Sequence, residues 1–266
     1  MGLTRRDGPL AARPLATVNY RLDGPAHKLL MHPFPRRVRA EVGGRTVLDT
    51  RRGTLLHETA LLPVLYVPEG DLEAGAFTPS THTTHCPFKG DATYRDLRVG
   101  DRHVPNALWA YPDPLPAALW LAGRAALYWH AADSWYDEDD EVFAHLTDPF
   151  TRVDIRPTSR HVRVSASDGT VIAESTKPVV LCETGLPDRF YLSPADVRVE
   201  IRPTATRTRC PYKGEASYWD VVLPDGGTVR DAAWSYPTPL PESTRIEGLL
   251  SFAHDELTVE VDGQRA

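Results

Sequence analysis

Two cysteines of this chain stand in the same short sequence, and that sequence can make a thiol reactive. Cys86 is followed by Pro-Phe-Lys-Gly and Cys210 by Pro-Tyr-Lys-Gly. Proline favours an extended residue before it, and Lys-Gly favours a tight turn that brings the ammonium of Lys89 or Lys213 back toward the sulfur. A nearby cation stabilises the thiolate, so the pattern predicts a nucleophile or covalent anchor. A second interpretation stays open, in which each cysteine is a small buried apolar residue and each lysine a solvated turn residue.

The residues just before the two thiols predict different tasks for the two copies. Two histidines precede the first thiol, and an imidazole can serve as a general base. Two arginines precede the second, and guanidinium groups are suited to holding an anion. The first copy is therefore expected to be the more reactive. The candidate catalytic residues are Cys86, Lys89, His85 and His82, and the candidate ligand-binding residues of the second copy are Cys210, Lys213, Arg209 and Arg207.

The same residue types raise the question of a metal. His82, His85 and Cys86 could bind zinc, but a structural zinc site usually has four protein ligands and no fourth is present nearby. The third cysteine, Cys182, has no cation near it in the sequence and is expected to be inert. With three scattered cysteines and no C-x-x-C pair, we expect reduced thiols, no metal and no cofactor.

An aromatic segment also occurs twice in the chain. Trp109-Ala-Tyr111-Pro returns as Trp234-Ser-Tyr236-Pro, and residues two apart share one face of an extended segment. The four rings are candidate ligand-binding residues, because pockets for planar or sugar-like molecules are largely aromatic and apolar. The alternative is that these rings close the core of a sheet.

These blocks belong to an internal duplication of the chain. The nine residues from Cys86 recur from Cys210 with six identities, and the cysteine-to-tryptophan intervals are 23 and 24 residues. Weaker matches extend the repeat, among them His57-Glu-Thr with Cys182-Glu-Thr. The sequence therefore predicts two tandem homologous domains at 37–130 and 161–264. A proline-rich irregular arm at 1–36 and an acidic linker at 131–160 are expected outside them.

Period-two alternation of apolar residues predicts the elements that position these groups. It occurs, for example, at 38–42, 197–202 and 257–261, and Asp-Gly and Gly-Gly pairs supply hairpin turns. The expected fold class is mainly β, with small antiparallel sheets. A few short helices are expected, at 116–123, at 133–143 and at 241–248.

The repeated motifs resemble those of a known family. The T-x-C-P-[YF]-K-G-x-A-x-Y block, the later W-x-Y-P-x-P and the joining stretch from Ser134 to Asp154 resemble the domain of unknown function 427, in the tandem form common in actinobacteria. The resemblance covers about residues 37 to 264. It implies a compact β-rich domain that occurs twice, and it implies no established reaction.

The label nucleotidyltransferase is attached to that family, and the residues give it little support. Such an enzyme commonly needs a Gly-Ser turn for the triphosphate and paired aspartates for two magnesium ions. Asp137 and Asp139 have the spacing of paired aspartates, but no Gly-Ser precedes them. Phosphate-loop, dinucleotide-binding and serine-hydrolase motifs do not occur in the chain either.

Composition narrows the classes of partner. The chain has 266 residues and a formal charge of −6, so it has no basic excess for nucleic acid. No apolar run approaches the roughly 20 residues of a spanning helix, and a cytoplasmic location without a membrane partner is expected. The favoured hypothesis is a small-molecule-binding protein that acts on its ligand through the thiol. A non-catalytic structural or interaction module and a nucleotidyltransferase-like activity stay as alternatives.

Overall fold

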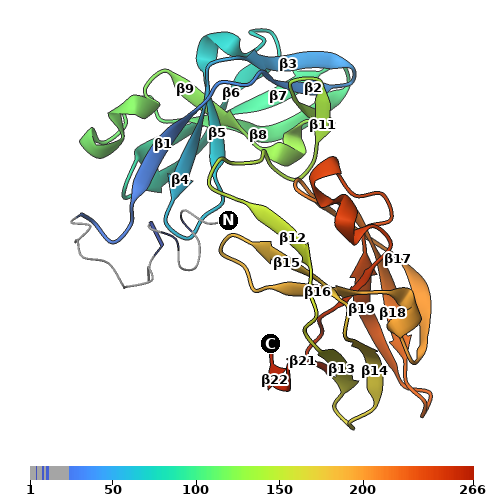
Figure 1. The fold of residues 1–266 in the computed structure, drawn as a ribbon. Coiled ribbons are helices and arrows are strands. Elements are labelled where there is room, and N and C mark those ends of the chain that lie inside the picture. Colours follow the sequence, from blue (N-terminus) through green and yellow to red (C-terminus); the bar gives the residue numbers. More distant parts are fainter. Residues whose placement is uncertain (1–3, 5–7, 9, 12–23) are drawn as a thin grey trace. The chain divides into compact units, whose positions relative to one another are not determined.

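The computed structural model describes residues 4, 8, 10, 11 and 24–266 (Figure 1). In this part of the chain the fold is mainly β: strands alternate with five short 3-10 helices, and no α-helix is present. The chain divides into two compact units, Met1–Phe150 and Thr151–Ala266, which we call unit 1 and unit 2. No helix among the described residues combines the length and apolar character needed to cross a membrane.

Unit 1 contains two antiparallel sheets. The larger sheet has seven strands in the order β1-β4-β5-β9-β8-β7-β6, and the smaller has four in the order β11-β10-β2-β3. The larger sheet consists of β1 (Leu29–Phe34), β4 (Gly53–Glu58), β5 (Val64–Pro68), β9 (Arg124–Leu127), β8 (Arg102–Ala110), β7 (Gly90–Val99) and β6 (Phe77–Cys86). The smaller sheet consists of β11 (Asp140–Val142), β10 (Ser134–Asp137), β2 (Val38–Val42) and β3 (Arg45–Thr50).

Unit 2 repeats this arrangement strand for strand. Its larger sheet has the order β12-β15-β16-β20-β19-β18-β17, and its smaller sheet the order β14-β13-β21-β22. The larger sheet consists of β12 (Val153–Pro157), β15 (Val179–Glu183), β16 (Arg189–Leu192), β20 (Leu250–Phe252), β19 (Thr228–Ser235), β18 (Gly214–Val222) and β17 (Glu200–Cys210). The smaller sheet consists of β14 (Val171–Ser175), β13 (Val162–Ala166), β21 (Leu257–Val261) and β22 (Gln264–Arg265). The predicted duplication and the predicted fold class are both confirmed.

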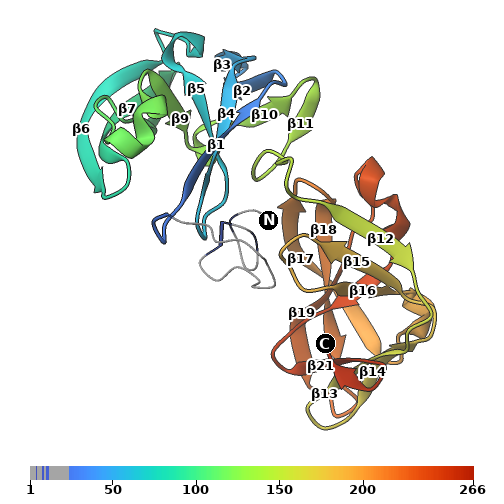
Figure 2. The same cartoon turned by 60° about the vertical axis from the view of Figure 1, so that its left-hand side comes forward.

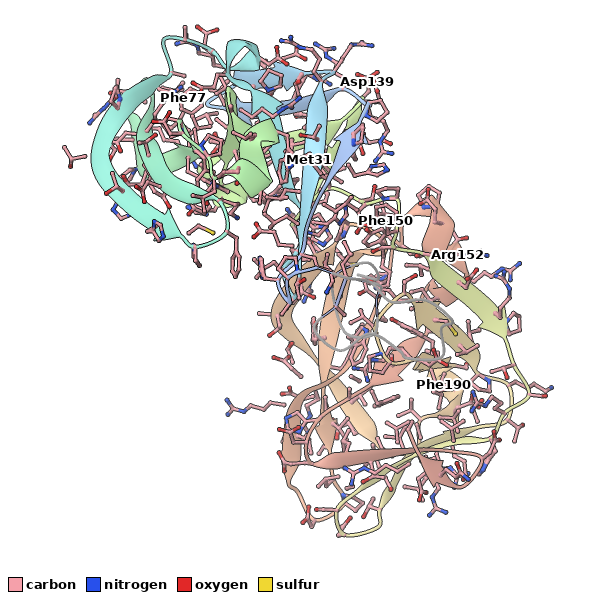
Figure 3. The ribbon with its side chains drawn as sticks, turned by 90° about the vertical axis from the view of Figure 1, so that its left-hand side faces the viewer. Met31, Phe77, Asp139, Phe150, Arg152 and Phe190 are labelled. Atoms are coloured by element: carbon pink, nitrogen blue, oxygen red, sulfur yellow. The ribbon has the colours of Figure 1, made fainter. Side chains whose placement is uncertain are left out.

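The larger sheet of each unit is covered on both faces. Its inner face packs on the smaller sheet; in β2, for example, Val38, Ala40 and Val42 are fully buried while the residues between them are not. Its outer face carries a second apolar cluster, which in unit 1 includes the buried residues Ala118 and Leu121. Both belong to the 3-10 helix η2 (Pro116–Leu121), beside β7 and β9 in Figure 2. Side chains of both faces are drawn in Figure 3, where Phe77 belongs with the inner face and Met31 with the outer face.

One expectation about local structure needs correction. The helix expected at 133–143 is the hairpin β10–β11, because Trp135 must face the core from a strand that pairs with β2. The short helices expected at 116–123 and 241–248 are present as the 3-10 helices η2 and η5 (Pro241–Ile246). Residues 131–160, expected as a linker, contain the last residue of the 3-10 helix η3 (Trp129–Ala131), the hairpin β10–β11 and strand β12, which pairs with β15.

The proline-rich arm at 1–36 is described only in part. Its residues Leu29–Phe34 form the edge strand β1, paired with β4. Residues 1–3, 5–7, 9 and 12–23 of the arm lie outside the described residues. The remaining 3-10 helices are η1 (Glu69–Asp71) and η4 (Pro194–Asp196).

Candidate functional site

The cysteine blocks form the turns of two equivalent hairpins. In β6–β7 the backbone N–H of Lys89 donates to the carbonyl of Cys86 at 3.2 Å, and in β17–β18 Lys213 donates to Cys210 at 3.3 Å. The glycine that follows has a left-handed φ, +105° at Gly90 and +98° at Gly214. The sequence Cys-Pro-aromatic-Lys-Gly therefore builds a hairpin turn that fixes the direction of the lysine side chain.

That direction leads to a buried carboxylate at the end of β4. Lys89 Nζ donates to Glu58, and the two side chains are 9% and 6% exposed. The same ammonium lies 5.5 Å from the centroid of the Tyr111 ring. The lysine is therefore buried and ion-paired, which contradicts the solvated turn residue of the second interpretation.

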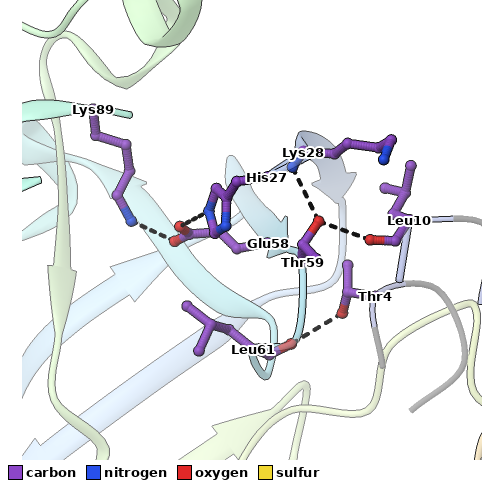
Figure 4. Close-up of polar contacts among 8 residues, drawn as sticks. All are labelled: Thr4, Leu10, His27, Lys28, Glu58, Thr59, Leu61 and Lys89. Atoms are coloured by element: carbon purple, nitrogen blue, oxygen red, sulfur yellow. Dashed lines mark hydrogen bonds and ion pairs between the residues drawn. The ribbon is translucent and has the colours of Figure 1, made fainter. Parts of the chain in front are cut away.

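Glu58 has a further neighbour, His27, in the segment just before β1. His27 Nε2 lies 3.2 Å from Glu58 Oε2 (Figure 4). The His27 ring stacks on Phe88 with centroids 4.0 Å apart. Beside this group the loop after β4 binds the start of the chain, since Thr59 Oγ1 donates to the carbonyl of Leu10 at 2.7 Å.

Aromatic and hydroxyl groups surround the ion pair on the outer face of the sheet. Trp109 Nε1 donates to the hydroxyl of Tyr66 at 3.0 Å, and Thr84 Oγ1 lies 3.0 Å from the hydroxyl of Tyr94. Burial raises the pKa of Tyr66 well above its usual range, and burial does the same to the pKa of Tyr111. Both phenols are therefore neutral hydrogen-bonding groups at neutral pH.

Unit 2 reproduces the group. Lys213 Nζ donates to Glu183 on β15, and each side chain is at most 10% exposed. Trp234 Nε1 donates to the Tyr191 hydroxyl at 3.3 Å. We call the two groups the outer-face clusters: Glu58, Tyr66, Thr84, Cys86, Lys89, Tyr94, Trp109 and Tyr111 in unit 1, and Glu183, Tyr191, Thr208, Cys210, Lys213, Tyr218, Trp234 and Tyr236 in unit 2.

The structure brings most of the predicted site residues together. The cysteine, lysine, tryptophan and tyrosine predicted in each copy all belong to its outer-face cluster. The cysteine and tryptophan are half-buried in both units, so part of each cluster reaches the surface. His82 also lies at the first cluster, with its ring 4.5 Å from that of Tyr94.

Three predicted residues lie elsewhere. His85 Nδ1 is 2.6 Å from Asp91 at the exposed side of the hairpin, and Arg209 pairs with Glu215 at 3.0 Å. Arg207 donates to backbone carbonyls of its own strand. Strand alternation explains all three cases. These residues stand one or three positions before the cysteine on β6 or β17, so their side chains point to the opposite face of the sheet from the thiol.

Sequence reasoning missed half of each cluster. Glu58, Tyr66, Thr84 and Tyr94 and their equivalents Glu183, Tyr191, Thr208 and Tyr218 were not among the predicted site residues. Two weaker matches between the copies carried a signal for part of this set. A glutamate follows both His57 and Cys182, and Tyr66 of the first copy recurs as Tyr191 of the second.

Cys182 lies outside both clusters. It precedes Glu183 on β15 and so faces the other side of the sheet. Desolvation and a hydrogen bond with Asp188 raise the pKa of its thiol, which disfavours the reactive thiolate. Among the described residues no set of three His, Cys, Asp or Glu side chains is close enough to hold a metal ion.

A protein family matches both halves of the chain. The family described as "Domain of unknown function (DUF427)" matches residues 30–138 and again residues 154–263. No curated protein matches the chain. Each matched segment contains one complete outer-face cluster.

Proposed function

The chain belongs to the DUF427 family in two tandem copies, and we propose that each unit binds a small molecule on its outer-face cluster. The ligand carries a ring, planar or sugar-like, and polar groups. The ring rests on the exposed part of the tryptophan and the polar groups meet the hydroxyls and the rim of the ion pair. The three free cysteines support a reducing compartment such as the cytoplasm.

The observation that carries this proposal is the buried Lys–Glu pair in both units. Removing two charges from water costs several kcal/mol per ion, and apolar residues of similar volume are often as stable or more so. A structural role alone therefore gives no reason for such a pair on an otherwise aromatic face. Polar groups held beside half-buried aromatic rings are typical of a ligand site.

The geometry supports binding better than catalysis by the thiol. The ammonium predicted to activate Cys86 is bound by Glu58, and the His85 imidazole is directed away. The thiol still lines the cluster and is half-buried there, so covalent chemistry at Cys86 stays a hypothesis within the proposal.

The two units differ in the rings around the cluster. In unit 1, Tyr128 lies 4.4 Å from the Trp109 ring, and His27 and His82 stand beside the cluster. In unit 2 the Arg189 guanidinium lies 5.9 Å from the Trp234 ring instead. We expect unit 1 to favour ring stacking and unit 2 to favour a ligand with negative charge.

The test uses tryptophan indole N–H signals as reporters. Two of them are assigned with Trp109→Phe and Trp234→Phe, and nitrogen-15-labelled protein is titrated with pools of nucleosides, monosaccharides and aromatic acids. A compound that shifts the Trp109 or Trp234 signal is expected, with affinity reduced at least tenfold in Lys89→Met/Glu58→Leu or its unit 2 counterpart.

Arg207→Ala is the matched control, because Arg207 lies on the same hairpin and faces away from the thiol. Its affinity should equal that of the wild type. Indole signals that no compound moves, or an affinity unchanged by loss of the ion pair, would contradict the proposal.

A second candidate function has one observation in its favour. Large apolar side chains are exposed around the first cluster, including Phe88 on the turn and Leu115, Leu119 and Trp120 at η2. The corresponding helix η5 has the polar sequence PESTRI. These residues favour an interaction module, and Leu119→Glu should then abolish any concentration-dependent self-association seen by sedimentation.

A further inference from the structure

Unit 2 contains a pocket that is separate from its outer-face cluster. The pocket has a volume of about 350 Å³ and lies between the two sheets, on the inner face. Its apolar walls include Val164 on β13, Phe190 and Leu192 on β16, Phe252 on β20 and Val259 on β21. The polar groups that line it are Asp188, Arg189, His254, Asp255 and Arg265. Phe190 is labelled in Figure 3.

The same place in unit 1 is filled by two stacked tryptophans. The rings of Trp129 and Trp135 are 4.5 Å apart at their centroids and 10° from parallel. Trp135 is 3% exposed, and its Nε1 donates to the carbonyl of Trp129 at 2.9 Å. Both rings pack within the inner core of unit 1.

Strand register shows that Val259 is the counterpart of Trp135. Trp135 pairs with Ala40 at the centre of β2, and Val259 pairs with Val164 at the centre of β13. β2 and β13 occupy equivalent positions in the two smaller sheets. Unit 2 therefore has a much smaller side chain where unit 1 has an indole ring.

His254 is the counterpart of Trp129 by the same reasoning. Trp129 comes two residues after Leu127, the end of β9, and His254 comes two residues after Phe252, the end of β20. Tyr128, just before Trp129, donates its backbone N–H to β8. Ala253, just before His254, donates its backbone N–H to the equivalent strand β19. Two tryptophans of one copy are thus replaced by a histidine and a valine at the pocket of the other.

The size and walls of the pocket suit a small organic molecule. Ligand pockets usually have volumes of about 300–1,000 Å³ and mostly apolar walls with a few polar groups at the opening. Space left in an apolar core costs the packing of its walls, and a molecule of matching shape restores that packing. Unit 1 shows the shape that fills this space, which is flat and aromatic.

We propose that the inter-sheet pocket of unit 2 binds a small flat aromatic molecule in the place where unit 1 packs its own Trp129 and Trp135 rings. The proposal does not depend on the function assigned to the outer-face clusters. It concerns the other face of the sheet, and the cluster residues do not line the pocket.

Indole is the probe for the test. We expect the full-length protein to bind one indole, measured by titration calorimetry, and Val259→Trp to lower the affinity at least tenfold by filling the pocket. Arg207→Ala, in the same unit but outside both the pocket and the outer-face cluster, is the matched control and should leave the affinity unchanged. Absence of binding to the wild type, or equal affinity in Val259→Trp, would overturn the proposal.

A second variant and a direct measurement cover the case in which Val259→Trp fails to fold. Val164→Phe narrows the pocket from the neighbouring strand β13 and should also weaken binding. If neither variant gives the circular dichroism of the wild type, transfer of magnetisation from bound indole to the methyl groups of Leu192 and Val259 decides. Contacts with those methyls support the site, and contacts confined to other residues refute it.

Discussion

The ammonium of Lys89 and that of Lys213 are the most constrained charges described at the outer-face clusters. Each is paired with a carboxylate and almost out of contact with water. Loss of one partner from such a pair leaves a buried charge uncompensated, which costs about 3–5 kcal/mol. The two copies differ in one respect, because Glu58 also has His27 beside it.

The first prediction compares the two lysines. We expect Lys213→Met to lower the free energy of unfolding by about 3–5 kcal/mol, and Lys89→Met to lower it less because His27 can still pair with Glu58. Urea denaturation of both variants measures the difference. The double variants Lys213→Met/Glu183→Leu and Lys89→Met/Glu58→Leu should recover most of the loss, and equal losses in single and double variants would show that the charge is not the cause.

The second prediction concerns a buried histidine on the other face of β4. His57 is 1% exposed, and its Nε2 has no hydrogen-bond partner among the described residues. The Phe150 ring lies 5.2 Å from it and the His32 ring 6.5 Å. Burial lowers the pKa of His57 below its usual 6.5, while the charge of Asp148 acts in the opposite direction.

A lowered pKa in the folded state means that the neutral imidazole is the stabilising form. The contribution is present above pH 6.5 and is lost as the pH falls through the folded pKa. We expect His57→Leu to reduce the loss of unfolding free energy between pH 7 and pH 5, measured by urea denaturation. Exposed His103 pairs with Asp96, and His103→Leu should not reduce that loss; parallel profiles for wild type and His57→Leu would contradict the assignment.

Sequence reasoning at this scale found the residue types and missed their partners. The turn at Cys86 was predicted, but a lysine can reach either the thiol or a strand that is distant in the sequence. The choice of Glu58, on β4, depends on the sheet order β4-β5-β9-β8-β7-β6, which no local pattern encodes. His85 was assigned to the thiol from its position in the chain, whereas strand alternation directs it away.

At the scale of elements, a left-handed residue recurs at one point of the large sheets. Asn106 on β8 has φ +52°, and Asp231 on β19 has φ +48°. The backbone N–H of Asn106 donates to Asp96 at 2.9 Å, and that of Asp231 to Asp220 at 2.8 Å. Register shifts occur at these points, so each residue forms an irregularity that interrupts regular pairing.

The third prediction follows from that backbone conformation. A β-branched residue is strained in the left-handed region, and the cost of the conformation is roughly 1–2 kcal/mol for ordinary residues. We expect Asn106→Val to lower the free energy of unfolding by at least about that amount. Asn106→Gly loses the hydrogen bond that Ser80 donates, but glycine adopts the left-handed conformation without strain. This variant should therefore cost less. The reverse order of the two variants in chemical denaturation would show that backbone strain is not decisive.

The elements themselves were predictable where one face of a strand is buried. Segment 38–42 and its equivalent 162–166 show the alternation in sequence and in burial alike. A short helix was expected at segment 133–143, which forms the hairpin β10–β11 instead. Its conformation is set by the pairing of β10 with β2, a contact about 95 residues away in sequence that local propensity cannot reveal.

At the scale of the whole molecule, each unit has its own inner core and its own outer-face cluster. The duplication was readable from two motif blocks because turns and buried aromatic residues tolerate little change in their spacing. The extent of each unit was less readable, since edge strands such as β1 and β12 carry weaker patterns than central ones. The family matches end at 138 and 263, whereas unit 1 continues to Phe150.

The fourth prediction concerns that extent. Separately produced fragments 1–150 and 151–266 should each unfold cooperatively, as judged by thermal circular dichroism, because each has a complete core. A fragment that ends at residue 144 should melt at a lower temperature than 1–150, because it lacks Phe150 and Asp148 beside His57. Equal melting temperatures would show that these residues contribute nothing to unit 1.

The stacked pair Trp129 and Trp135 also has an optical consequence. Indole rings 4.5 Å apart and nearly parallel couple their excited states, so the pair should absorb and emit differently from the other tryptophans. Unit 2 has no such pair among its described rings, since His254 and Val259 stand in the equivalent positions. The fluorescence of this pair therefore reports on unit 1 alone, without an added dye. Its change during heating, compared with the fluorescence of the other tryptophans, shows the order in which the two copies unfold.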